Sequence, residues 1–150
     1  MKTGVFVLLL GIAAVFSLPA QTAEIIETIG NESEISVGSA AYIAAASSNL
    51  IEPDASPRQA LDALADRGYR AGGDAEDESV RLDRFAYMLM VAHDLPGGVM
   101  YSLFPGPRYA FREFEFERIL RGGGNPGDPL SGTRALRLTG RVLSIVEARG

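Results

Sequence analysis

Apolar residues recur at three- and four-residue spacing in four stretches of this chain, and this spacing predicts amphipathic helices. The stretches are residues 39–50, 56–68, 81–95 and 131–148. In the third stretch, apolar residues cover nearly the whole circumference, which is typical of a helix in the centre of a domain. Ser56, Pro57 and Gln59 form a capping-box pattern at the start of the second, and Ser131 has the residue type of an N-cap.

Residues 109–120 fit two secondary structures. Acids and phenylalanines alternate from Glu113 to Glu117 as they would in a half-buried strand, whereas Tyr109, Phe116 and Leu120 share one helical face. We favour a helix, because a proline precedes the stretch, glycines follow it and its neighbours are predicted helices. Its aromatic residues are expected mainly in the core: Tyr109, Phe111, Phe114 and Phe116.

The remaining segments are predicted to be loops or linkers. Residues 24–37 are acidic and are expected to form a linker or a loose edge strand. Residues 99–104 are apolar but lie between Pro-Gly motifs, so we expect a loop tucked against the body. Residues 122–129 form a Gly/Pro-rich loop that lacks the Gly-Lys-Ser/Thr sequence of a phosphate loop.

Residues 1–23 have the pattern of a secretory signal peptide. Lys2 precedes a short apolar core, and small residues follow it, with possible cleavage after Ala20 or Ala23. The alternative is an uncleaved anchor, but the apolar core is short for a membrane span. We therefore expect an exported protein, periplasmic or associated with the cell envelope, with a single helical domain at residues 38–150.

Charge is distributed unevenly along the chain. The formal net charge of −5 argues against a general nucleic-acid binder. Residues 24–100 hold 14 acids and 5 arginines, whereas residues 101–150 hold 8 arginines and 5 acids. Either the two halves pack together and neutralise each other, or arginines line a face for an anionic partner.

The sequence offers little catalytic chemistry. With no cysteine, disulfides and thiolate metal sites are excluded. His93, the single histidine, is predicted at a helix C-terminus. A histidine interacts favourably with the helix dipole there and needs no catalytic role. The acids of residues 74–78 lack the spacing of an EF-hand, so a solvated loop is expected there. No catalytic residue, metal site or cofactor is predicted.

Arginines supply the candidate binding residues. Three of them share one side of the last predicted helix, at three- and four-residue spacing, and two more lie at the start of residues 109–120. Guanidinium groups suit carboxylates and phosphates. The candidates are Arg108, Arg112, Arg134, Arg137 and Arg141. A solvated charged face is the alternative interpretation.

The order of helices and Gly/Asp/Pro loops resembles the S-layer homology family, whose helix-loop-helix repeats carry a Thr-Arg-Ala-Glu motif at the start of the second helix. The corresponding starts here are residues 55–60, 80–86 and 130–136. The resemblance implies binding of anionic cell-wall polysaccharide. Pro57, Leu82 and Gly132 stand where the family has its arginine, so no ligand-binding residue transfers from the family.

Together, these patterns predict an all-α protein of about five short helices, arranged in repeat-like helix-loop-helix units with long Gly/Pro loops. We expect a noncatalytic envelope module that binds a protein or an anionic wall polymer, with membrane contact only through an uncleaved signal segment. One alternative is a small periplasmic hydrolase using Glu113, Glu115 and Glu117. The other is an assembly subunit without its own ligand, which predicts an exposed apolar patch at residues 99–104.

Overall fold

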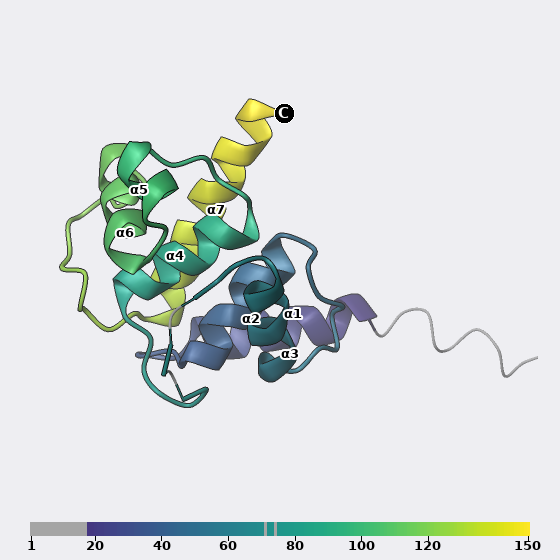
Figure 1. Cartoon of the computed structure of the whole chain (residues 1–150). Coiled ribbons are helices and arrows are strands. Elements are labelled where there is room, and N and C mark those ends of the chain that lie inside the picture. Colours follow the sequence, from purple (N-terminus) through teal and green to yellow (C-terminus); the bar gives the residue numbers. More distant parts are fainter. Residues whose placement is uncertain (1–17, 71, 74) are drawn as a thin grey trace, which may run out of the picture.

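The computed structural model describes residues 18–150 except residues 71 and 74, and its regular structure is helical (Figure 1). Seven helices follow one another along the described chain: α1 (Leu18–Gly30), α2 (Val37–Ser47), α3 (Pro57–Asp66), α4 (Leu82–Ala92), α5 (Val99–Leu103), α6 (Pro107–Phe116) and α7 (Gly132–Arg149). The predicted all-α class is confirmed, with two more helices than expected. Most of the predicted signal peptide lies outside the described residues.

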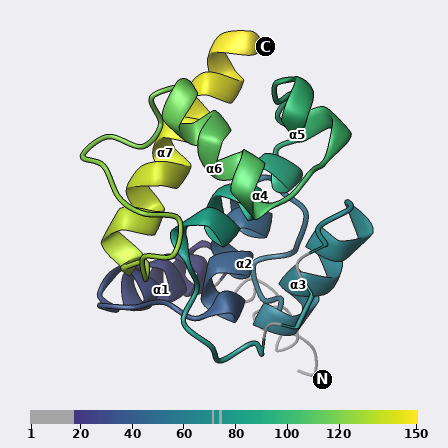
Figure 2. The same ribbon diagram turned by 60° about the vertical axis from the view of Figure 1, so that its left-hand side comes forward.

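Helices α2 and α4 form the centre of the core. Eight of the 11 residues of α2 and nine of the 11 residues of α4 are buried, which confirms the prediction of a central helix in the third stretch. Alanines in α2 allow neighbouring helices to approach closely, and α2 packs against α3, α4 and α7. Helix α4 packs mainly against α6. Helix α7 runs from α1 to the end of the molecule that carries the C-terminus (Figure 2).

Side-chain caps set the starts of three helices. The capping box predicted at the start of α3 is present, with reciprocal hydrogen bonds of 3.2 and 2.7 Å between Ser56 and Gln59. Ser131 caps α7 by accepting a hydrogen bond from the Arg134 amide. Ser36 caps α2 in the same way, so α2 begins two residues earlier than predicted.

Three segments distant in sequence meet where α2, α4 and α7 begin; we call residues 35–37, 80–82 and 130–132 the junction. Each segment starts with a fully buried apolar residue: Ile35, Val80 or Leu130. Their backbones are joined directly, since the Ile35 amide donates to the Leu130 carbonyl over 2.8 Å and the Val80 amide to the Ile35 carbonyl over 2.9 Å. The junction therefore ties together segments up to 95 residues apart.

The first helical amide of each of these helices also donates to another segment. A helix leaves its first amides without partners in its own backbone, so each needs an acceptor from elsewhere. Each acceptor carbonyl lies in the segment that precedes another of the three helices. The donor–acceptor pairs are Val37–Glu78, Leu82–Asp128 and Gly132–Glu32, over 2.8 to 2.9 Å. The start of α3, in contrast, is capped only by its own side chains.

Two segments that the sequence predicted to be a linker and a loop are helical, so these two predictions were wrong. Residues 24–30, expected in a linker or edge strand, belong to α1, because Ile29 is buried in the core and α1 packs against α7. Residues 99–103, expected as a loop, form α5, whose Tyr101 is buried beside Tyr87. In α5 one buried side chain decides the packing, and a single apolar position carries no periodicity. In α1, Ile25 and Ile26 also pack against the core, at helical spacing from Ile29.

Helix α6 confirms the helical alternative for residues 109–116. Phe111 and Phe114 are buried as expected and Tyr109 is partly buried. Phe116, however, is 82% exposed, so its assignment to the core was wrong. It lies at the last position of α6, on the side opposite Phe111 and Phe114, where no other helix covers it.

None of the helices described in residues 18–150 is long and apolar enough to cross a membrane.

The junction makes a specific prediction about Gly132. A Cβ at this position lies within 1.7 Å of the Ile29 carbonyl oxygen, so Gly132→Ala forces α1 away from α7. We expect this change to lower the free energy of unfolding by about 2–4 kcal/mol, measured by urea denaturation. Gly140→Ala, on the same helix with open space around it, is the matched control, and should raise stability by up to about 1 kcal/mol. Equal effects of the two changes would contradict the close approach.

Candidate functional site

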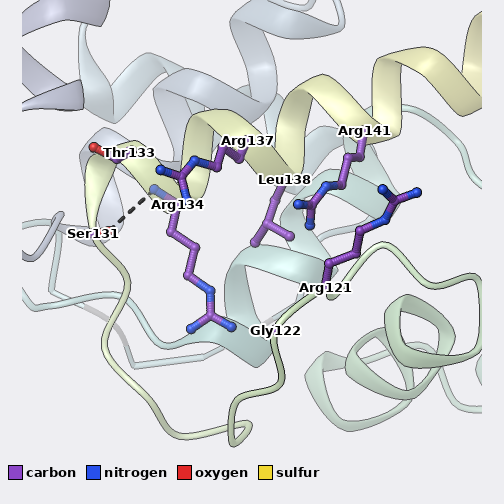
Figure 3. A pocket seen from close by; sticks show the side chains of 8 residues that line it. All are labelled: Arg121, Gly122, Ser131, Thr133, Arg134, Arg137, Leu138 and Arg141. Carbon is purple, nitrogen blue, oxygen red and sulfur yellow. Dashed lines mark hydrogen bonds between the residues drawn. The ribbon is translucent and has the colours of Figure 1, made fainter.

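Four arginines line one cleft between α7 and the chain that follows α6 (Figure 3). Three come from successive turns of α7, because their three- and four-residue spacing places them on one face, and the fourth precedes the glycine-rich loop. The cleft has a volume of about 390 Å³ and is lined by Arg121, Gly122, Ser131, Thr133, Arg134, Arg137, Leu138 and Arg141. We call it the arginine cleft.

Arg134 holds the glycine-rich loop against α7. Its guanidinium donates a hydrogen bond to the Gly123 carbonyl. The loop can come this close because residues 122–124 are glycines with φ values of 92°, 73° and 139°, a region that other residues rarely adopt. A Cβ on Gly124 would lie 2.7 Å from the same guanidinium. The glycine run therefore shapes one wall of the cleft.

Arg141 fixes a second point of the same segment. Its guanidinium donates to the Ile119 carbonyl over 2.6 Å, which joins the middle of α7 to the chain just after α6. Figure 3 shows the side chains of Arg141 and Arg121 next to one another at this end of the cleft. Two like charges thus face the same space, an arrangement that a bound anion relieves.

Two of the four guanidinium groups are held by nothing within the described chain. Arg121 and Arg137 are exposed, and among the residues that the structure describes neither side chain forms a hydrogen bond or an ion pair. Their hydrogen-bond donors are available to a ligand. The cleft thus combines two arginines engaged with the backbone and two that are free.

No acid lines the cleft. Asp128 lies in the same glycine-rich loop, but its carboxylate accepts hydrogen bonds from the backbone and side chain of Asn125, at 2.7 and 3.4 Å. A cleft with charges of one sign attracts ions of the opposite sign, even on a protein whose net charge is −5. The geometry thus favours a ligand with carboxylate or phosphate groups.

The structure divides the predicted binding residues into two groups. Arg134, Arg137 and Arg141 line the arginine cleft, whereas Arg108 and Arg112 lie exposed on α6 and do not line it. Arg121 lines the cleft but was not predicted. Its position before three glycines was visible in the sequence, but its approach to α7 depends on the Arg141 contact with Ile119, which has no local signal.

His93 lies beside a serine without forming a nucleophilic pair. Its Nε2 is 3.0 Å from Ser47 Oγ, but Ser47 donates its hydroxyl proton to the Ala44 carbonyl over 2.9 Å. The histidine is therefore the donor in this contact, and the serine is not activated. Burial lowers the pKa of His93, which stands at the C-cap of α4 as predicted.

The carboxylates of α6 do not surround a substrate-sized space. Glu113 and Glu117 line a cavity of about 10 Å³, which is room for about one water molecule. Glu115 is exposed, and Glu117 lies 3.6 Å from Arg149 in an ion pair. Within the described part of the chain, no group of histidine and acidic side chains could hold a metal ion.

Comparisons of the chain with protein-family models, with curated proteins and with solved structures find no match.

The arginines of the cleft are expected to differ in their effect on stability. Arg141→Ala removes the hydrogen bond to the Ile119 carbonyl and should lower the free energy of unfolding by about 1 kcal/mol. Arg137→Ala removes an exposed side chain without a partner and should change it by less than about 0.5 kcal/mol. Urea denaturation of both variants tests this division, and a larger loss for Arg137→Ala would reverse it.

His93 gives the stability a predictable pH dependence. Because burial holds its folded-state pKa below the usual value of about 6.5, the unfolded chain binds more protons between these two pKa values. Neutral His93 makes its full contribution to the free energy of unfolding above about pH 6.5. This contribution is lost as the pH falls from there toward the lower, folded-state pKa. The measurement is the free energy of unfolding at about pH 7.5 and about pH 5. The wild-type protein should lose more stability than His93→Gln; equal losses would show that His93 does not contribute.

Proposed function

We propose that this protein is an exported, noncatalytic interaction module of the cell envelope, and that it binds an anionic wall component or an acidic segment of a protein through the arginine cleft. One observation carries the proposal: four arginines and no acid line a cleft of about 390 Å³ on a protein with a net charge of −5. Such a concentration of like charge is costly unless a counter-charge is present. Export rests on the signal-peptide pattern of residues 1–23.

The noncatalytic assignment is supported by the surroundings of the residues that could act on a substrate. A hydrolase needs two carboxylates, or an activated nucleophile, facing a space that holds the substrate. The cavity beside Glu113 and Glu117 has a volume of about 10 Å³, and the Ser47 hydroxyl donates to the backbone rather than to His93. The hydrolase alternative that uses Glu113, Glu115 and Glu117 therefore lacks a space that holds a substrate.

We also propose that α2, α4 and α7 begin at equivalent positions of three quasi-repeats. Support comes from the junction, where each helix start follows a buried apolar residue and donates its first amide to another segment. In this arrangement the first of the three equivalent helix starts lies near Ser36, whereas the resemblance to S-layer homology repeats placed it at residues 55–60. The resemblance to S-layer homology repeats stays at the level of this arrangement, because the motif arginine is absent.

Binding to defined polyanions tests the function. The wild-type chain should bind immobilised polyphosphate and polyglutamate, with an affinity that falls as salt rises. Arg121→Ala with Arg137→Ala should weaken binding about tenfold or more, since two charge-assisted contacts of about 1 kcal/mol each are lost. These two arginines are chosen because their removal leaves the backbone contacts of Arg134 and Arg141 intact.

Arg58→Ala with Arg67→Ala is the matched control, since it changes the net charge equally but lies outside the cleft, on and just after α3. It should weaken polyanion binding much less. Equal weakening by the two double variants would mean that net charge, not the cleft, determines binding. Retention of purified envelope polymer by the wild type and its loss in the cleft variant would extend the result to a natural ligand.

A further inference from the structure

Helix α5 presents an apolar face to solvent. Three of its side chains and that of its C-cap residue are large, apolar and open: Val99 is 75% exposed, Met100 46%, Leu103 64% and Phe104 61%. We call these four residues the α5 patch. The patch lies where the assembly-subunit hypothesis expected exposed apolar residues.

The patch is held outward by packing on its other side. Tyr101 is the buried residue of α5, and its ring lies edge-on to that of Tyr87 in α4, with 6.3 Å between ring centres. The loop before α5 lies directly against this ring, since a Cβ on Gly97 would come within 2.4 Å of it. One side of α5 is thus fixed to the core, and the apolar residues of the patch point away from it.

Two exposed cations lie close to the patch in sequence, while the nearest carboxylates, those of Asp94 and Glu113, lie near the buried Tyr101, and that of Glu113 lies against Gly98 at the start of α5. Residues 95–112 contain no acid, and their two cations are Arg108 and Arg112, which lie exposed one turn apart on α6. Helices α5 and α6 pack side by side (Figures 1 and 2). Among the described residues, neither arginine has a hydrogen-bond or ion-pair partner. An apolar face beside free cations complements a surface that is apolar inside and anionic at its rim.

The size of the patch fits shallow insertion better than a protein interface. Four side chains expose at most a few hundred Å², roughly what the largest patch of a monomer offers, whereas a stable protein interface buries about 800 Å² on each partner. Insertion into the headgroup region of a bilayer requires only a few apolar side chains together with cations for anionic lipid phosphates.

We propose that the α5 patch is a membrane-contact site: its four side chains enter the interface of an anionic bilayer, and Arg108 and Arg112 bind lipid phosphates. This site is separate from the arginine cleft and does not depend on the function proposed for it. It also changes the expectation that only an uncleaved signal segment touches a membrane. A second, independent contact arises at the end of the molecule opposite α1 (Figures 1 and 2).

A tryptophan placed in the patch gives a local test in the full chain, which contains no tryptophan of its own. Phe104→Trp should show a blue-shifted emission with vesicles of phosphatidylcholine and phosphatidylglycerol, and quenching by lipids brominated near the headgroup. Thr28→Trp, at an exposed position of α1 outside the predicted signal peptide, reports any contact made by the other end of the molecule. A shift for Thr28→Trp alone would assign vesicle binding to the N-terminal end and overturn the proposal.

Variants on the Phe104→Trp background separate the two parts of the site. Leu103→Ser should weaken partitioning about tenfold, and its exposed position leaves the fold intact, which thermal unfolding checks. Arg108→Ala with Arg112→Ala should weaken binding to anionic vesicles at low salt, with little effect on vesicles of phosphatidylcholine alone. Arg58→Ala with Arg67→Ala, exposed on and just after α3 and outside both sites, is the charge-matched control and should leave partitioning unchanged.

Sedimentation of the wild-type chain without lipid tests the main competing occupant. If the chain forms a dimer that Leu103→Ser dissociates, while Phe104→Trp stays unshifted with either kind of vesicle, a second copy covers the patch and the membrane proposal is wrong. Monomeric protein with a vesicle-dependent shift at position 104 supports the proposal.

Discussion

Backbone hydrogen bonds at the starts of α2, α4 and α7 are the constraint on which this fold depends. Each of these helices has a first amide that its own backbone leaves without a partner, and each donates it to a carbonyl from another segment. The donor residues Val37, Leu82 and Gly132 are buried, and an amide that lost its acceptor there would be costly to leave unpaired. The positions of the central helices are therefore set at their starts.

The two proposed sites draw on different consequences of this arrangement. Once the start of α7 is fixed, its successive turns face the chain after α6, and Arg134 and Arg141 hold that chain in place. The same face leaves Arg137 free, and Arg121 lies free beside Arg141 (Figure 3). The α5 patch arises at the other side of α6, where a single ring, Tyr101, attaches a short helix to the core. Stability and binding thus use neighbouring residues of the same elements.

Local signals in the sequence were enough to predict most of the helices. Ser56 with Gln59, and Ser131, act within one turn of the chain, so their capping roles could be predicted from residue type and spacing. Helix α5 was missed because its packing depends on Tyr101, a single residue whose partner Tyr87 lies in another helix, and only three-dimensional contacts distinguish this segment from a loop. Helix α1 was missed because its acidic residues suggested a linker, although Ile25, Ile26 and Ile29 have helical spacing and pack against the core.

The part of the candidate site that lies on one helix could also be predicted from the sequence. Helical spacing placed Arg134, Arg137 and Arg141 on one face before any fold was known, and the cleft contains all three. The inclusion of Arg121, and the separate position of Arg108 and Arg112, depend on how the chain turns after α6. That turn is set by glycine backbone angles and by the reach of Arg141 to the Ile119 carbonyl.

The junction also has a consequence for the order in which the chain can fold. Its third segment, residues 130–132, lies at the start of α7, so the hydrogen bonds that join Ile35 to Leu130 and Leu82 to Asp128 cannot form until the chain has been synthesised as far as these partners. Contacts between such distant segments require the closure of long loops, which slows folding compared with a helical bundle stabilised by local contacts. Although the elements named in the described residues are all helices, their assembly therefore depends on contacts that are distant in sequence.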